Sequence, residues 1–294
     1  MKKSADHFKR IGLLGNAEKA ACAASVRAAD RLIQRSGRKV VCDVVTARLA
    51  KLKCNVCPDA TALAKEVDLL IVFGGDGTML HTARQIAGTQ TPMLGVNIGG
   101  LGFLTAVPSD RLAEALKTVW RGEFRYESRA LIEATGTGCG KKIKAVALND
   151  IVISRGAASR LISLDVSVDG EPITRYRCDG LIVSSPTGST AYSLAAGGAI
   201  VLPTAEVFAL TPICPHALSN RSIILPLSST IRMKAIKTEP ATFLNADGQI
   251  AGELSNDDQV VIRRSRSAVR LLHLADSSFL EALRRKLHWR GTYL

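Results

Sequence analysis

One glycine-rich loop carries the residues best placed for chemistry. Gly74-Gly75-Asp76-Gly77-Thr78 follows an apolar segment at 68–73 and precedes a helical pattern that begins at Met79. Glycines allow backbone N–H groups to approach a ligand closely, and a helix N-terminus favours an anion such as phosphate. Asp76 would then take a proton from a hydroxyl nucleophile or hold a divalent cation. The alternative is a structural turn in which Asp76 caps the helix.

A second segment offers hydroxyl and backbone hydrogen bonds but few charges. A strand pattern at 179–185 leads into Pro186-Thr187-Gly188-Ser189-Thr190-Ala191-Tyr192-Ser193-Leu194-Ala195 and a pair of glycines. Such groups suit a ribose or a base edge better than a phosphate. Asn149-Asp150 lies between apolar runs, where a simple turn is an equal alternative to a binding role. The cations close to these segments in the sequence are Arg160, Arg175 and Arg177, and each alone is expected to be solvated.

Three further patterns resemble known sites but lack defining residues. In the run at 136–141, Thr135 replaces the first glycine of GxxxxGK and Lys142 replaces its Ser or Thr, so a hairpin turn is expected. Residues 95–102 are glycine-rich but do not spell GxGxxG. Cys54-Asn55-Val56-Cys57 has no second Cys or His pair at zinc-ligand spacing, which predicts reduced thiols.

The elements that must position these residues change in kind along the chain. The first 120 residues alternate strand and helix patterns, which predicts a parallel sheet covered on both faces. Gly37 is expected to end the first helix, on which Arg27, Arg31 and Arg35 share one face. The expected strands are 11–15, 40–45, 68–73 and 92–97, and the expected helices are 17–35, 79–86 and 110–120.

After Gly122 the segments alternate or are β-branched, so a mostly-β region is expected to about residue 274. Asp169-Gly170 and Asp247-Gly248 indicate hairpin turns. A helical pattern returns at 277–288. The expected strands of this half include 161–168, 230–236 and 259–262. We therefore predict an α/β domain at 1–122, a β-rich domain at 123–270 and a C-terminal segment at 271–294.

The net charge of +13 over 294 residues is concentrated at the two ends of the chain. Residues 1–60 hold 13 basic and 5 acidic residues, and residues 259–294 hold 8 and 2, whereas residues 61–258 hold 18 and 19. Few aromatics accompany these charges, so solvated helix faces are favoured over an RNA-binding surface. The sequence shows no apolar run long enough for a membrane span and no secretory signal pattern, so a cytoplasmic protein is expected.

Several segments together resemble the bacterial NAD kinase family, and the resemblance covers residues 11–287. It implies an α/β domain, a β-rich domain and a final segment that packs back on the first domain. It also implies transfer of the γ-phosphoryl group of ATP to the 2′-hydroxyl of the adenosine ribose of NAD, which gives NADP. The segments that carry it are GGDGT at 74–78, Leu148-Asn149-Asp150, DGLIVSSPTGSTAYSLAAGG at 179–198, residues 210–216 and Asp247-Gly248-Gln249.

The same resemblance implies roles for matching positions. Asp76 is the acid that activates the 2′-hydroxyl, within a nucleotide loop formed with Gly74, Gly75, Gly77 and Thr78. His81 matches a basic position near the phosphates, although by itself it is expected on a helix surface. Asn149 and Asp150 match the pair that binds the acceptor ribose. The further matches to nucleotide contacts are Arg160, Arg177, Asp179, Thr190, Ala191, Tyr192, Ser193, Leu194, Ala195 and Gln249.

The resemblance further implies Mg²⁺ or another divalent cation held mainly through the donor phosphates, with no dedicated protein site. It implies a homodimer or homotetramer, and a basic residue at position 177 is associated with preference for NAD over NADH. Two alternatives stay open. A diacylglycerol-type lipid kinase shares a similar glycine-rich loop, and a nucleic-acid-binding protein would explain only the basic ends. Neither a membrane nor a nucleic-acid partner is expected.

Overall fold

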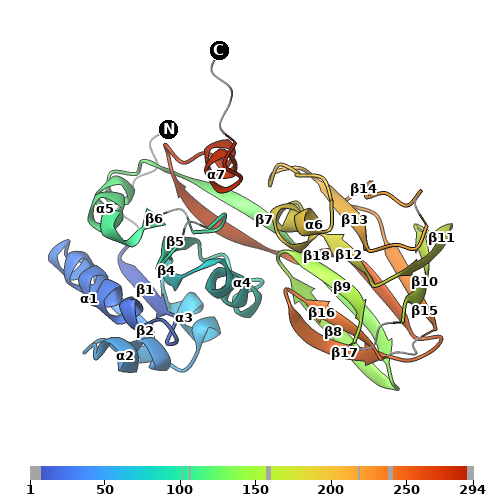
Figure 1. Cartoon of the computed structure of the whole chain (residues 1–294). Helices are drawn as coiled ribbons and strands as arrows, with labels where there is room; N and C mark the ends of the chain where they lie inside the picture. Colours follow the sequence, from blue (N-terminus) through green and yellow to red (C-terminus); the bar gives the residue numbers. More distant parts are fainter. Residues whose placement is uncertain are drawn as a thin grey trace, which may run out of the picture. The chain divides into compact units, whose positions relative to one another are not determined.

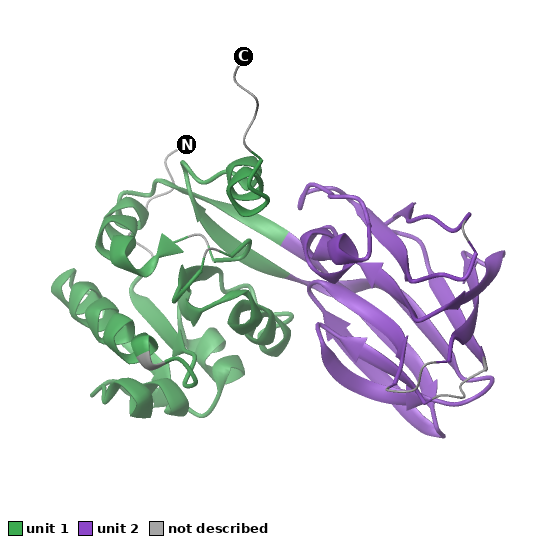
Figure 2. Cartoon of the chain, in the orientation of Figure 1, with its two compact units in different colours: residues 1–128, 269–294 green, residues 129–268 purple. Residues whose placement is uncertain are grey.

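The computed structural model describes residues 8–289 except 101, 106, 157–159, 218 and 238–240. The chain forms two compact units, one of residues 1–128 with 269–294 and one of residues 129–268 (Figure 2). Strands β7 (Phe124–Gly138) and β18 (Gln259–Leu274) each contribute residues to both units. Each unit has its own hydrophobic core.

The first unit contains one parallel sheet in the order β5-β4-β1-β2-β3, and β6 and the last part of β18 both pair with β5 (Figure 1). Every residue of β4 and β5 is buried, as expected for strands covered on both faces. The strands are β1 (Arg10–Gly15), β2 (Lys39–Asp43), β3 (Asn55–Cys57), β4 (Leu69–Gly74), β5 (Met93–Asn97) and β6 (Val107–Pro108).

The helices of this unit follow strands of the sheet, as in other α/β folds. Helix α1 ends at Arg35, and Gly37 adopts a φ of +77° just beyond it, as predicted. The helices are α1 (Ala20–Arg35), α2 (Val44–Ala50), α3 (Ala60–Glu66), α4 (Asp76–Gln85), α5 (Leu112–Trp120), which follows the 3-10 turn η2 (Ser109–Arg111), and α7 (Phe279–Lys286).

The prediction of a strand at 40–45 is wrong at its end. Strand β2 stops at Asp43 because the Asp43 carboxylate accepts a hydrogen bond from the Thr46 N–H at 2.9 Å and caps a helix. Val44 and Val45 therefore belong to α2 and are exposed, although β-branched residues favour strands. Helices α2 and α3 and strand β3 were all missed, because short elements carry little periodicity.

The second unit is made of two antiparallel sheets whose inner faces form one core. The first is the antiparallel part of a 12-stranded sheet that continues through β18 into the parallel strands, and it joins β11-β10-β15-β18 with β7 and β8 (Figure 1). The second is a six-stranded sheet in the order β14-β13-β12-β9-β16-β17. The remaining strands are β8 (Lys141–Ala147), β9 (Asp150–Arg155), β10 (Ile162–Val168), β11 (Glu171–Cys178), β12 (Gly180–Ser184), β13 (Val207–Ile213), β14 (Ile223–Pro226), β15 (Ile231–Lys237), β16 (Thr242–Ala246) and β17 (Gln249–Leu254).

Two-residue turns join several of these strands as predicted. Asp169-Gly170, Asp247-Gly248 and Cys139-Gly140 all have positive φ at both positions, which is the geometry of type I′ hairpin turns. The run at 136–141 is thus a hairpin and not a phosphate loop. The predicted fold class is confirmed, including the C-terminal helix α7 that belongs to the first unit. In the described part of the chain, no helix is long and apolar enough to cross a membrane.

Candidate active site

The glycine-rich loop joins the buried strand β4 to helix α4. Gly75 is the N-cap of α4 and Asp76 is its first residue, so the alternative in which Asp76 caps the helix is wrong. The helix also begins three residues earlier than Met79, the predicted start. A Cβ at Gly74 would overlap the side chain of Thr78, so only glycine fits where the strand turns into the helix.

The carboxylate of Asp76 is held by a second glycine-rich loop, which follows β5. Its Oδ2 accepts a hydrogen bond from the Phe103 N–H at 2.8 Å, and its Oδ1 accepts one from the Leu104 N–H at 3.0 Å. A Cβ at Gly102 would overlap Oδ1, which explains why a glycine stands there. The Asp76 side chain is 30% exposed. It is therefore fixed in direction and open to a ligand on one side.

Two lysines from distant parts of the chain approach these loops. Lys19, before α1, donates from Nζ to the Ile98 carbonyl at 2.8 Å. Lys286, at the end of α7, places Nζ 3.9 Å from Oδ2 of Asp76 and 4.6 Å from the centre of the Phe103 ring. Sequence reasoning missed both lysines, because nothing local marks either as a neighbour of the loop. His81 is exposed on α4, as expected for a helix-surface residue.

In the second unit, Asp247 organises the segment that contains Asn149 and Asp150. Its carboxylate accepts hydrogen bonds from the N–H groups of Leu148 at 3.0 Å, Asn149 at 2.7 Å and Asp150 at 3.3 Å. Asp150 is the first residue of β9 and is not part of a simple turn. The turn that carries Asp247 also places Gln249 at the start of β17, so these predicted residues lie together.

The carboxyl group of Asp150 is buried, with 5% of the residue exposed. Burial, and then the negative charge of Asp247, raises its pKa from 3.8 to about 7. Desolvation disfavours the charged carboxylate, and a like charge nearby adds to the effect. Asp150 therefore changes charge near neutral pH, which is unusual for an aspartate and typical of functional sites.

The hydroxyl-rich loop after β12 packs on the same segment. Ser185 donates from its N–H to the Asn149 carbonyl at 2.8 Å and from its hydroxyl to the Leu148 carbonyl at 2.5 Å. A Cβ at Gly188 would overlap the backbone of Asn149. The loop continues through the 3-10 turn η3 (Thr187–Thr190) and helix α6 (Tyr192–Ala195), so the predicted residues 190–195 lie on one short structure.

The side chains of this loop differ in exposure. Tyr192 is 47% exposed, whereas Ser193 is buried and its hydroxyl lies 3.1 Å from that of Thr211. Thr190, Ala191 and Leu194 are partly buried, and Ala195 is exposed. The Tyr192 ring is thus accessible from solvent, whereas the Ser193 side chain is turned inward and holds the loop.

Another predicted contact, Asp179, is not part of this cluster. In the β9–β12 pair, Ser184 lies opposite Asp150 and Gly180 lies opposite Ser154, so Asp179 is five residues along the strand from Ser184, roughly 17 Å at about 3.3 Å per residue. Asp179 is paired there with Arg155, whose Nε lies 2.6 Å from Oδ1, and sequence reasoning missed Arg155. Arg177 and Arg160 are exposed.

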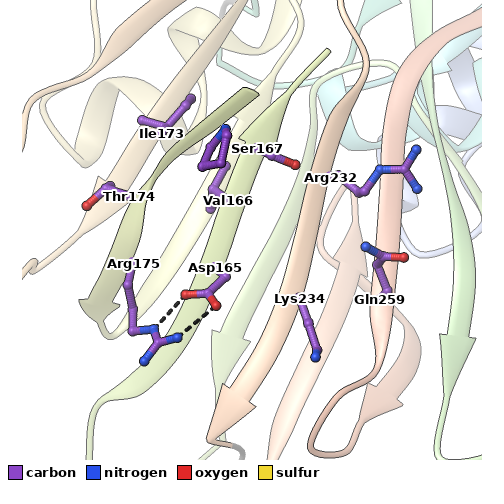
Figure 3. Close-up of a pocket in the computed structure, with 10 residues that line it drawn as sticks. Asp165, Val166, Ser167, Ile173, Thr174, Arg175, Arg232, Lys234 and Gln259 are labelled. Atoms are coloured by element: carbon purple, nitrogen blue, oxygen red, sulfur yellow. Dashed lines mark hydrogen bonds and ion pairs between the residues drawn. The ribbon is translucent and has the colours of Figure 1, made fainter. Parts of the chain in front are cut away.

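A separate hollow of about 450 Å³ lies on the outer face of β10, β11, β15 and β18. Figure 3 shows Asp165 and Arg175 joined by hydrogen bonds on this face, with Lys234, Arg232 and Gln259 on the neighbouring strands. None of the predicted nucleotide contacts lines this hollow. Its charges are partly neutralised, because Arg175 pairs with Asp165 and Lys234 pairs with Asp257.

Within the described ranges, no three His, Cys, Asp or Glu side chains are grouped so that they could hold a metal ion. The seven cysteines are all free thiols. Burial raises the pKa of Cys42, Cys54 and Cys57, which keeps these thiols protonated and poorly reactive.

Comparison with known proteins places both units in one family. The model of the ATP-NAD kinase N-terminal domain matches residues 11–124, and that of the C-terminal domain matches residues 148–274. The chain is 38% identical to an NAD kinase of Methylibium petroleiphilum, over 97% of this chain and 96% of that protein. It is 45% identical to an NAD kinase of Neisseria meningitidis, over 80% of this chain and 79% of that protein.

Solved structures agree with the sequence comparisons. The crystal structure of yeast NADH kinase complexed with NADH matches with a TM-score of 0.86 at 27% identity, over 98% of this chain and 89% of the yeast chain. An NAD kinase from Archaeoglobus fulgidus in complex with ATP shares the fold, with a TM-score of 0.74 at 24% identity, over 96% of this chain and 100% of that one. The chain belongs to the NAD kinase family.

Proposed function

We propose that this protein transfers the γ-phosphoryl group of ATP to the 2′-hydroxyl of the adenosine ribose of NAD and so makes NADP. The observation that carries the proposal is the fixed carboxylate of Asp76 at the N-terminus of α4, in a chain of this family. A carboxylate in this position is an acceptor for the proton that a hydroxyl nucleophile loses.

The group to be activated is a weak nucleophile, because the pKa of a ribose hydroxyl lies far above 7. Asp76 accepts the 2′-hydroxyl proton as the bond from O2′ to phosphorus forms and the bond from phosphorus to the leaving oxygen of ADP breaks. Proton transfer of this kind contributes about 10²–10⁴-fold to a rate. Gly74, Gly75, Gly77 and Thr78 present the backbone close to the nucleotide, and His81 is proposed to lie near the phosphates.

We assign acceptor binding to the second unit. The Asn149–Asp150 pair binds ribose hydroxyls, and the loop residues Thr190, Ala191, Tyr192, Ser193, Leu194 and Ala195 surround NAD together with Gln249. The hydrogen bonds of Asp247 to this segment support the assignment, because they hold its backbone in one shape. Arg160, Arg177 and Asp179 are proposed as further NAD contacts.

We propose that Mg²⁺ or another divalent cation is held mainly by the donor phosphates. When bound, such an ion neutralises the charge of the transferring phosphoryl group. The two backbone hydrogen bonds use only part of the acceptor capacity of the Asp76 carboxylate, so Asp76 would supply at most one protein ligand to such an ion and the donor phosphates would supply most of the others.

The acceptor preference follows from Arg177 in this proposal. A cation close to the nicotinamide end would distinguish the charged ring of NAD from the neutral ring of NADH. The similar yeast structure is an NADH kinase, so the family includes proteins that use either form. We expect NAD to be the better acceptor, and equal turnover with NADH would contradict this assignment.

The alternatives are less well supported. A lipid kinase and a nucleic-acid-binding protein both leave the full-length match to NAD kinases unexplained. The basic charge of α1 lies on exposed residues Arg27, Arg31 and Arg35, which agrees with a solvated helix face. The cytoplasmic location and the homodimeric or homotetrameric state stay predictions.

The test is a direct assay of product. Purified protein is incubated with ATP, Mg²⁺ and NAD, and NADP is detected with an NADP-specific dehydrogenase, with diacylglycerol as the acceptor in a parallel reaction. We expect NADP to form and the lipid to stay unphosphorylated. Phosphorylation of the lipid without NADP formation would refute the proposal.

A further inference from the structure

Helix α7 reaches the Asp76 loop from the other end of the chain and is well anchored there. The Phe279 ring lies 6.1 Å from the Phe103 ring, centre to centre, and Leu283 is buried in the same unit. Ser278 caps the helix by accepting a hydrogen bond from the Glu281 N–H at 3.4 Å. These contacts hold the start and the middle of α7 against the first unit, and the helix then carries Lys286 to the loop that holds the Asp76 carboxylate.

Lys286 lies in that last turn, and its ammonium group is close to Asp76 without being committed to it. Nζ is 3.9 Å from Oδ2 of Asp76, which is longer than a hydrogen bond. The two oxygens of Asp76 already accept the N–H groups of Phe103 and Leu104. The Lys286 side chain is 29% exposed, and its ammonium lies over the Phe103 ring. Its three N–H donors are therefore available to an incoming anion.

The chemistry proposed for Asp76 requires such a cation. Phosphate-binding loops of other kinases place a lysine against the transferring phosphoryl group, but the segment 74–78 contains none. A carboxylate next to phosphates adds a like charge, which a positive group must offset. Lys19 is also close to the loop, but its Nζ is engaged by the Ile98 carbonyl. Lys286 is better placed to serve the reacting atoms.

We propose that Lys286 is a catalytic residue whose ammonium binds an oxygen of the phosphoryl group as it moves from ADP to the 2′-oxygen of NAD. This inference rests on the proposed function. In the step, the bond from phosphorus to the β-bridging oxygen breaks with its electron pair left on ADP, and the bond from O2′ to phosphorus forms. The 2′-hydroxyl proton goes to Asp76, and Lys286 stays protonated throughout and stabilises the charge.

The test compares three variants of the full-length protein. Lys286→Met removes the charge and keeps a side chain able to cover Phe103, Lys286→Arg keeps the charge, and Arg285→Met removes a neighbouring exposed charge on the same helix. We expect Lys286→Met to lose about 10²–10³-fold in kcat, as for the removal of one charge-stabilising donor. The NAD dissociation constant and Tm should not change, Lys286→Arg should recover most of the loss, and Arg285→Met should resemble the wild type.

Other results would overturn the assignment. Wild-type kcat in Lys286→Met would show that the ammonium does not act in the step. A loss that also lowers Tm, or that Arg285→Met shares, would show a structural role for α7. A loss confined to the KM for NAD would place Lys286 in acceptor binding. These outcomes are distinct from failure of the proposed function, in which the wild-type protein itself makes no NADP.

Discussion

The buried carboxyl of Asp150 predicts an unusual dependence of stability on pH. The residue is 5% exposed, and burial with the nearby charge of Asp247 raises its pKa from 3.8 to about 7. In the unfolded chain the group ionises at the ordinary value. Between the two values the folded state therefore holds a proton that the unfolded state has lost, so stability decreases as pH rises.

The magnitude follows from the difference between the two pKa values. Each pH unit of difference corresponds to about 1.4 kcal/mol. Below the unfolded pKa of 3.8, the protonated Asp150 carboxyl does not lower the free energy of unfolding. Once the pH exceeds the folded value of about 7, the free energy of unfolding is about 4 kcal/mol lower than it is at low pH. Between pH 5 and pH 8 the loss is about 3 kcal/mol, which is a large fraction of the stability of a typical domain.

The assay is urea unfolding of the wild type and of Asp150→Asn at pH 5 and pH 8. The asparagine keeps the shape but does not titrate, so the stability of the variant relative to the wild type should increase by about 3 kcal/mol from pH 5 to pH 8. Other carboxyl groups titrate equally in both proteins and cancel. If the difference in unfolding free energy between the two proteins does not change with pH, the pKa of the Asp150 carboxyl is not raised by burial and by the charge of Asp247.

A control with the opposite sign is available in Asp165. The Arg175 guanidinium hydrogen-bonded to it lowers the pKa of this carboxyl. Its stabilising contribution is present above the unfolded pKa and is lost as pH falls. Because this titration lies at and below the ordinary value of 3.8, the stability of Asp165→Asn relative to the wild type should decrease as pH rises through the acid range and stay constant between pH 5 and pH 8, where that of Asp150→Asn increases.

Three further predictions follow from single contacts. Gly102→Ala places a Cβ against Oδ1 of Asp76, so kcat should fall about tenfold or more while NAD still binds. The control Gly100→Ala, whose Cβ meets open space, should behave as the wild type. Equal activities of the two variants would show that a side chain at position 102 does not displace the Asp76 carboxylate. The Arg155–Asp179 pair should show a small favourable coupling in a double-mutant cycle of urea unfolding, because both side chains are partly exposed to solvent. The absence of any coupling would show that the pair is not formed in solution. The affinity for NAD, measured by titration calorimetry, should increase as pH rises through about 7, because the ionised Asp150 carboxylate accepts hydrogen bonds from the ribose hydroxyls. Asp150→Asn should lose this pH dependence. If the affinity of the wild type does not change with pH, Asp150 is not part of the acceptor site.

Local signals in the sequence were sufficient for much of the fold. The apolar runs that become β4 and β5, the Gly74–Thr78 segment in which β4 turns into α4, and the two Asp-Gly hairpins all depend on residues adjacent in the chain. The error at residues 44–45 has a local cause as well. β-branched valines predicted a strand, but the Asp43 cap ended it, and capping competes directly with side-chain propensity.

The parts of the candidate site that the sequence did not reveal depend on contacts between distant residues. Asp76 is oriented by Phe103 and Leu104 and approached by Lys286, 210 positions along the chain. The Asn149–Asp150 segment is shaped by Asp247, and Asp179 is paired with Arg155. No periodicity marks such partners. The one available signal was the cluster of glycines at 99–102, since a glycine often stands where another group approaches closely.

The central claim is that Asp76 activates the hydroxyl group of NAD. The most direct measurement is the rate of NADP formation by the wild type and by Asp76→Asn at saturating ATP, Mg²⁺ and NAD, with NAD binding measured on the same samples. The asparagine can still accept one of the two backbone hydrogen bonds, so the fold and NAD binding should persist while turnover falls about 10²–10⁴-fold. Turnover close to that of the wild type, with NAD bound equally well, would contradict the role of Asp76.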